Sequence, residues 1–207
     1  MNIFRAKFLD FLHKIGYYSD VSVSLFDRYY DEIVVENQKV NLFSRKMDFN
    51  EIWLRLFLDS VSVFEVFNDF SGKRVLDFGT GGGLPSLPIK ILTPDMKLTL
   101  LDSTKKKLES VKSMVNRLGL IDVDYMWCRL ESGEVKSFCG TFEVIVSRGV
   151  RITFGTSQAL IRLLSKNGKI LLYKSDNASD IHWFRDCVIH EMKIDELSDR
   201  KIFIISK

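Results

Sequence analysis

The chain has 207 residues, 46% of them hydrophobic, and a net charge of +3. This length suits one α/β domain with an additional segment, and the weak positive charge permits nucleic-acid binding without requiring it. No run of about 18 apolar residues exists, which excludes a membrane-spanning helix. The start of the chain lacks the apolar core of a signal peptide, and the three cysteines lack metal-binding spacing. We therefore expect a cytoplasmic protein without a metal.

Residues 1–70 are predicted to form an N-terminal helical cap. Three stripes of apolar residues recur there at helical spacing. Gly16 ends the first predicted helix, and Asp48 and Asn50 are candidate caps for the third. The stripes fall within residues 3–15, 21–34 and 52–64. Such stripes more often form a hydrophobic core than a cofactor site.

Residues 71–207 are predicted to form a second part in which short apolar runs alternate with helical patterns. Such alternation is typical of a parallel sheet with helices on both faces. The predicted strands are 73–78, 97–102, 122–128, 142–147 and 168–174, and the predicted helices are 85–92, 104–118 and 153–165. Two further runs, 188–194 and 201–205, indicate a terminal hairpin that would add an antiparallel edge. The fold class is therefore α/β, with a mostly parallel sheet of seven strands.

A glycine-rich turn follows the first predicted strand. Its sequence is Asp77-Phe78-Gly79-Thr80-Gly81-Gly82-Gly83-Leu84-Pro85. Glycines allow positive φ and close approach of a ligand to the backbone, and a proline is well tolerated in the first turn of a helix. A strand, a glycine turn and a helix N-terminus together favour a nucleotide-type cofactor site over a plain αβ turn.

The glycine spacing distinguishes between two cofactors. A dinucleotide site needs G-x-G-x-x-G/A, and the third position falls on Leu84 or Ser86 here. An acidic residue followed by G-x-G-x-G instead resembles the S-adenosylmethionine loop of class I (Rossmann-like) methyltransferases. Asp77 is placed to face the ammonium group of that cofactor, directly or through water. Gly79, Gly81 and Gly83 would form the loop around it.

Asp102 ends the second predicted strand. An acidic residue at this position in such folds hydrogen-bonds the ribose hydroxyls of the cofactor. It could equally cap the helix that begins near Lys105, and both roles are compatible. Asp102 supports a nucleoside cofactor but does not separate S-adenosylmethionine from NAD.

Several short motifs together resemble one family. In chain order they are Asn41-Leu42, Leu58-Asp59-Ser60, Gly79 to Pro88, Leu101-Asp102-Ser103-x-Lys105-Lys106, Arg129-x-Glu131, Ser147-Arg148 and Tyr173-Lys174. This series is similar to the small-subunit ribosomal RNA guanine-N7 methyltransferases, once called glucose-inhibited division protein B. The resemblance implies S-adenosyl-L-methionine as cofactor and 16S rRNA of the small ribosomal subunit as partner, with N7 of one guanine as the acceptor atom.

The resemblance also implies roles for individual residues. Cofactor contacts are implied at Gly79, Leu84, Asp102, Leu130, Glu131 and Arg148. Arg148 and Lys174, at predicted strand ends, are the candidates for catalytic contacts to the guanine; each could instead be a solvated or ion-paired charge. Arginine can address O6 of guanine or a phosphate, and Arg151 is a further candidate. We expect the protein to act as a monomer.

The small number of candidate catalytic polar side chains suits the implied chemistry. Guanine N7 has an in-plane lone pair and carries no proton, so a general base is unnecessary and catalysis would consist mostly of positioning. Two other classes remain open. One is a class I methyltransferase acting on a small molecule or protein, with the helical cap as a lid. The other is a non-catalytic ribosome-assembly factor that retains a relic cofactor pocket.

Overall fold

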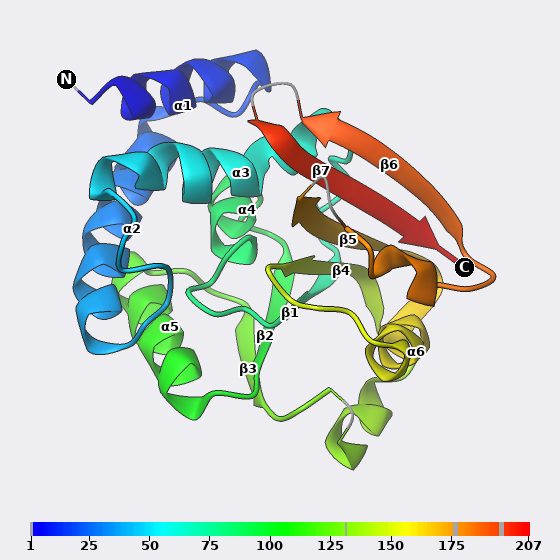
Figure 1. Ribbon diagram of the computed structural model, residues 1–207. Helices are drawn as coiled ribbons and strands as arrows, with labels where there is room; N and C mark the ends of the chain where they lie inside the picture. Colours follow the sequence, from blue (N-terminus) through cyan, green and yellow to red (C-terminus); the bar gives the residue numbers. More distant parts are fainter. Residues whose placement is uncertain (1, 131, 176–177, 195–196) are drawn as a thin grey trace.

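The computed structural model describes residues 2–130, 132–175, 178–194 and 197–207, and has a twisted sheet at its centre (Figure 1). The sheet order is β3-β2-β1-β4-β5-β7-β6. The bounds are β1 Arg74–Phe78, β2 Lys97–Asp102, β3 Val123–Trp127, β4 Phe142–Arg148, β5 Leu164–Ser175, β6 Val188–Ile194 and β7 Leu197–Ser206. Strands β1 to β5 run parallel, and β7 pairs antiparallel with both β5 and β6. The predicted mostly parallel sheet of seven strands is confirmed.

Helices follow the parallel strands as the alternating pattern predicts. Their bounds are α4 Ser86–Leu92, α5 Lys105–Leu118 and α6 Phe154–Leu163, with 3₁₀ turns at Gly133–Phe138 and Ile181–Trp183. Helix α5 ends at Gly119, whose φ of +72° forms a left-handed cap. In Figure 1, α5 and α6 lie on opposite sides of the sheet.

The N-terminal segment begins with two regular helices, α1 (Ile3–Lys14) and α2 (Asp20–Lys39). Asn2 caps α1, and a capping box of Ser19 and Ser22 begins α2. The third predicted helix is interrupted instead of continuous. It consists of a 3₁₀ turn at Phe49–Glu51, a π-helix at Trp53–Leu58, one turn of α3 (Asp59–Val61) and a 3₁₀ turn at Ser62–Glu65.

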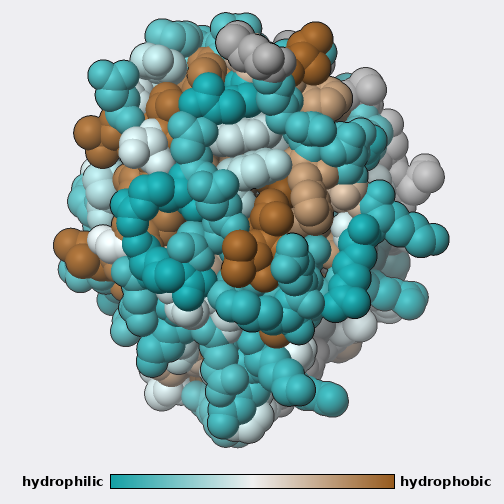
Figure 2. Space-filling model, turned by 90° about the vertical axis from the view of Figure 1, so that its left-hand side faces the viewer, coloured by the Kyte–Doolittle hydropathy of each residue, from teal (hydrophilic) through white to brown (hydrophobic). Residues whose placement is uncertain are grey.

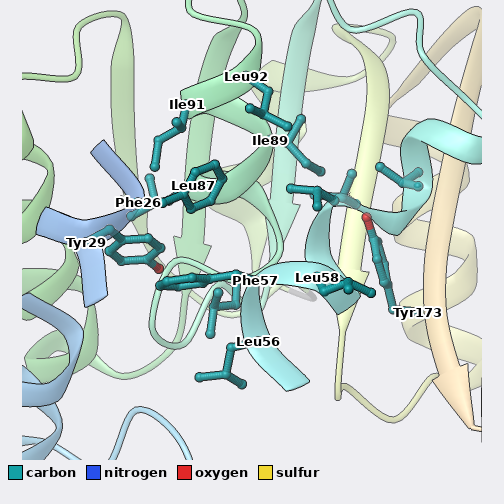
Figure 3. Close-up of a cluster of buried hydrophobic side chains, with 14 of the residues drawn as sticks. Phe26, Tyr29, Leu56, Phe57, Leu58, Leu87, Ile89, Ile91, Leu92 and Tyr173 are labelled. Atoms are coloured by element: carbon teal, nitrogen blue, oxygen red, sulfur yellow. The ribbon is translucent and has the colours of Figure 1, made fainter. Parts of the chain in front are cut away.

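Alternating side chains of the central strands point into two hydrophobic clusters, as the two-residue period of a strand requires. On β4, Val144 and Val146 face one cluster and Ile145 faces the other. The first cluster also contains residues of α1, α2, the π-helix, α4 and α5. Figure 3 shows Phe26, Tyr29 and Phe57 of the N-terminal segment beside Leu87 of α4. The N-terminal helices therefore share a core with the sheet.

The remaining differences from the sequence prediction are at element ends. Strand β5 begins at Leu164 instead of 168, since Leu164 pairs with Phe142 and the register then shifts before Val144. Helix α6 consequently ends at Leu163. The division predicted near residue 70 stays a prediction. Among the described residues, no helix has the length and apolar character that crossing a membrane requires. The face over the N-terminal helices is largely hydrophilic with scattered apolar residues (Figure 2).

Candidate active site

A cleft of about 710 Å³ opens where the carboxyl ends of β1, β2 and β4 meet. Ligands of open α/β sheets bind at this edge. The lining residues are Leu42, Phe43, Phe78, Gly79, Thr80, Gly81, Gly82, Leu84, Leu101, Asp102, Ser103, Thr104, Lys107, Cys128, Arg129, Leu130, Arg148, Gly149 and Val150. Five chain regions that are separated in sequence thus form one site.

The glycine loop forms one wall of the cleft and is held by backbone hydrogen bonds. The N–H groups of Gly79 and Thr80 both donate to the carbonyl of Leu101, at 2.8 and 3.1 Å. The buried hydroxyl of Tyr29 donates to the carbonyl of Gly82 at 2.7 Å. The loop is therefore fixed by β2 on one side and by helix α2 on the other.

Asp77 lies behind this loop and does not line the cleft. Its side chain is fully buried, and Oδ2 accepts hydrogen bonds from the hydroxyls of Thr80 (2.8 Å) and Ser86 (2.5 Å). Oδ1 is buried and has no partner among the described residues. Burial raises the pKa of Asp77 to about 6, although the hydrogen bonds from Ser86 and Thr80 oppose this rise. Asp77 thus positions the loop from behind.

Asp102 ends β2 and lines the cleft. Its carboxylate accepts the N–H of Gly81 at 3.0 Å and that of Thr104 at 2.8 Å. The same side chain thereby joins the glycine loop to the start of α5. Both roles considered from the sequence, a site carboxylate and a support for the following helix, are compatible with this geometry.

The segment after β3 forms the opposite wall. Cys128, Arg129 and Leu130 line the cleft there, and Leu130 is almost fully buried. The predicted contact Glu131 lies outside the described residues. Leu42 and Phe43, from the loop after α2, close the cleft from the N-terminal side. The walls thus combine apolar side chains with backbone polar groups, one carboxylate and the basic side chains of Lys107, Arg129 and Arg148.

Arg148 ends β4 and lines the cleft, but its charge is already paired. Its Nη1 donates to Oδ2 of Asp59 at 2.9 Å, and to the carbonyls of Arg55 and Leu56 at 3.3 and 3.4 Å. Asp59 is only 1% exposed. Its other oxygen, Oδ1, lies 3.7 Å from Nε of Arg200. One buried carboxylate therefore pairs with two arginines.

Lys174 does not line this cleft. It lines a neighbouring pocket of about 380 Å³, together with Arg151, Asp180 and Arg200. Its ammonium group donates to the carbonyl of Val150 at 2.8 Å and to Oδ2 of Asp180 at 2.7 Å. Gly149 and Val150 line both cavities, so the two are adjacent.

The predicted site residues thus occupy three positions. Gly79, Gly81, Leu84, Asp102, Leu130 and Arg148 line the cleft, Asp77 and Gly83 lie outside its lining, and Lys174 lines the second pocket. No role was expected from the sequence for Asp59 beyond its place in the Leu58-Asp59-Ser60 motif, and none for Asp180. Asp59 carries a signal, because it interrupts an apolar helical stripe, whereas nothing in the sequence around Asp180 marks it.

The cleft fits S-adenosylmethionine on structural grounds. A Cβ at Gly83 would lie 2.5 Å from Cδ1 of Leu87, so only glycine keeps the loop compact. The carboxylate of Asp102 suits the ribose hydroxyls, and the apolar wall at Leu130 suits a flat base. The buried Oδ1 of Asp77 leaves one acceptor unsatisfied beside the loop.

Solved structures confirm the fold. An S-adenosylmethionine-dependent methyltransferase from Aquifex aeolicus superposes with a TM-score of 0.63 at 15% identity, covering 83% of this chain and 98% of that one. A precorrin-6y C5,15-methyltransferase from Geobacter metallireducens gives a TM-score of 0.58 at 14% identity, covering 72% of this chain and 87% of that one.

Sequence relatives are more specific. "Ribosomal RNA small subunit methyltransferase G" of Lactobacillus johnsonii is 38% identical over 75% of this chain and 66% of its own length. The protein of the same name in Streptococcus gordonii is 34% identical over the same shares. The matched segment is thus just under two thirds of each relative. The model of the family described as rRNA small subunit methyltransferase G matches residues 22–197. The chain therefore belongs to the rRNA small subunit methyltransferase G family.

Proposed function

We propose that this protein transfers a methyl group from S-adenosyl-L-methionine to N7 of a guanine in the 16S rRNA of the small ribosomal subunit. The observation that carries this proposal is the adjacency of two cavities. A cleft with a glycine loop and a carboxylate lies against a pocket lined by Arg151, Lys174 and Arg200. The first suits the methyl donor, and the second, which combines these basic groups with the carboxylate of Asp180, suits a nucleotide acceptor.

The residues that would hold the cofactor lie around the cleft. Gly79 and Gly81 let the ligand approach the backbone, Asp102 offers a carboxylate to ribose hydroxyls, and Leu130 with Cys128 offers an apolar wall to adenine. When bound, S-adenosylmethionine supplies an electrophilic methyl group on a sulfonium. The chain's own residues then have to orient the acceptor and exclude water.

Guanine N7 carries no proton, so no side chain has to accept one during the transfer. Within the described residues, the ionisable side chains that line the cleft are Asp102, Lys107, Cys128, Arg129 and Arg148. No histidine lines either cavity in that part of the chain. An arrangement that positions two reactants without a general base is sufficient for this reaction, because orientation alone contributes a large part of the rate.

The proposal includes the setting in which the protein acts. We propose that the partner is the small ribosomal subunit and that the protein acts on it as a monomer in the cytoplasm. Basic groups at Arg151 and Arg200 would contact RNA phosphates, so methylation should weaken as salt concentration rises. Sedimentation of the free protein and of its mixture with subunits would test the stoichiometry.

The test is methyl transfer from labelled S-adenosylmethionine to small subunits that lack N7-methylguanine, followed by chemical cleavage at the modified base. We expect cleavage at a single guanine. Label in a protein or in a small molecule, with unlabelled RNA, would assign the cleft to another acceptor. Binding of the cofactor without any transfer would favour a non-catalytic assembly factor.

A further inference from the structure

The pocket beside the cofactor cleft contains an ion pair whose acidic member has no role in the reaction outlined above. Lys174, at the end of β5, and Asp180 are 2.7 Å apart, and their side chains are 11% and 16% exposed. Both line the pocket. Val150 accepts a hydrogen bond from Lys174 and also lines the cleft. The ion pair therefore lies next to a residue that the two cavities share.

This ion pair has one donor and one acceptor that the contacts between the described residues do not use. A protonated lysine has three N–H donors, and within the described part of the chain two are used, on Val150 and Asp180. Asp180 receives the N–H of Ile152 (2.6 Å) and the ammonium of Lys174 through the same oxygen, Oδ2. Burial raises the pKa of Asp180, but these two hydrogen bonds outweigh it and hold the pKa below its ordinary value. One donor and an ionised acceptor oxygen therefore remain for a ligand.

Guanine is the base whose edge complements this arrangement. Its O6 accepts a hydrogen bond, while N1–H and the N2 amino group donate. Adenine presents the reverse pattern, with a donor at N6 and an acceptor at N1. N7 lies on the other side of O6 from N1, so a group that holds N1 and N2 leaves N7 free. A base held this way can be methylated at N7 without losing a recognition contact.

We propose that this pocket binds the acceptor guanine, with Oδ1 of Asp180 accepting from N1–H and the N2 amino group and Lys174 donating to O6. The inference rests on the proposed function and names the residues that make it specific for guanine. N7 then points toward Gly149 and Val150, the residues that line both this pocket and the cofactor cleft.

The carboxylate of Asp180 favours a base over a phosphate as the group that binds next to Lys174. A phosphate seated against Lys174 would lie beside the ionised Asp180, and like charges at that distance repel. Arg151 lines the same pocket and has no carboxylate partner among the described residues, whereas Arg200 lies 3.7 Å from Asp59. The ion pair accordingly forms the hydrogen bonds to the base, and the two arginines contact the backbone phosphates of the nucleotide.

The test uses the full-length protein and small subunits reconstituted with rRNA that carries inosine in place of the acceptor guanosine. Inosine keeps N7, O6 and N1–H but lacks the N2 amino group. We expect wild-type kcat/KM to fall on the inosine substrate by about 10-fold or more. Asp180→Asn should lower kcat/KM on guanosine by about 10- to 100-fold, and the difference between guanosine and inosine should then disappear.

Two controls make the result specific. Asp27→Asn removes a carboxylate from an ion pair with Arg5 on the N-terminal helices, 2.8 Å long and away from both cavities, and should leave both rates unchanged. Cofactor affinity measured by calorimetry should be normal in Asp180→Asn and in Lys174→Met. Equal wild-type rates on guanosine and inosine, or a full inosine penalty in Asp180→Asn, would overturn the inference. If wild-type protein methylates no guanine N7 at all, the proposed function itself is wrong.

Discussion

At the scale of single residues, three glycines of the loop are needed because their φ is positive, and two of them also because of packing. A Cβ at Gly79 would overlap the side chain of Val150, and one at Gly83 would overlap Leu87. Gly81 has open space around it, but its φ of +54° disfavours any other residue, and its N–H is bound by Asp102. The loop therefore depends on backbone conformation at all three positions, where φ is positive, and on packing at two of them.

Gly81→Val should abolish measurable cofactor binding. A β-branched residue is strained at positive φ and would place its side chain at the lining of the cleft. Gly119→Val is the matched control, because Gly119 also has positive φ and open surroundings but caps α5 away from the cleft. Calorimetry should show normal affinity for the control and none for Gly81→Val. Equal affinities would show that the loop does not contact the cofactor.

Asp77 combines a cost in stability with a predicted role in binding. Its pKa is about 6, above the ordinary value of 3.8. The folded state thus binds a proton more tightly than the unfolded state, so Asp77 lowers stability fully above pH 6, and this penalty fades as pH falls toward 4. Ionised Asp77 destabilises the ligand-free fold by about 3 kcal/mol at neutral pH.

Asp77→Asn should therefore leave the melting temperature of the ligand-free protein at pH 7 equal or higher. Cofactor affinity should fall at least about 10-fold, because the neutral amide cannot balance the cofactor's positive charge. Wild-type affinity should also decline as pH drops below about 6, while that of Asp77→Asn stays flat. An Asn variant that binds as tightly as wild type at pH 7 would refute the charge role.

At the scale of elements, the junction of α2 and α5 is built around one carboxylate. Glu36 of α2 accepts hydrogen bonds from Ser110 (2.6 Å) and Arg117 (2.8 Å) of α5, and from Lys39 (2.8 Å) one turn along α2. Burial raises the pKa of Glu36, but hydrogen bonds from Lys39, Ser110 and Arg117 outweigh it and lower the pKa to about 2. Because α5 follows Asp102, this junction also supports the cleft.

Glu36→Gln should destabilise the protein by up to about 3 kcal/mol at neutral pH. A depressed carboxyl pKa contributes stability that is complete above about pH 4.5 and is lost as pH falls toward 2. The gap between wild type and variant should therefore narrow over that range. Urea titrations at pH 7, 4 and 3 would measure it. A gap that is constant with pH would mean that packing, and not charge, is lost.

At the scale of the whole molecule, the N-terminal segment and the sheet are joined by both packing and charge. Tyr173 of β5 donates to the carbonyl of Ser60 at 2.7 Å, beside the pair of Asp59 with Arg148. The guanidinium of Arg148 also reaches the carbonyls of Arg55 and Leu56 in the π-helix. Side chains inserted into a helix ladder interrupt its regular pattern, which accounts for the broken third helix.

Asp59→Asn should destabilise the protein by about 3–5 kcal/mol, because it leaves the nearly buried Arg148 without its counter-charge. The control is Asp27→Asn, in which a partly exposed pair is lost and about 0–1 kcal/mol is expected. Chemical denaturation would compare the two. Similar small losses in both variants would show that Asp59 contributes little to joining the segments.

Local patterns alone determined most of the architecture. Apolar runs marked the strands, helical spacing marked α1, α2 and α5, and glycine spacing marked the cofactor loop, since each of these depends on a few consecutive residues. Contacts between residues of distant elements could not be predicted from such local patterns. The partners of Arg148 and Lys174 are examples, because Asp59 lies on the N-terminal segment and Asp180 beyond the end of β5.

The sequence by itself thus determined the α/β fold, the family and the loop that positions the cofactor, because each of these depends on short periodic or contiguous motifs. Only the tertiary structure decided which charges are paired and which face a cavity. It placed Asp77 behind the loop and Lys174 in the pocket beside the cofactor cleft. The physical reason is that burial and pairing depend on distances through space, which the folded chain sets and local sequence does not.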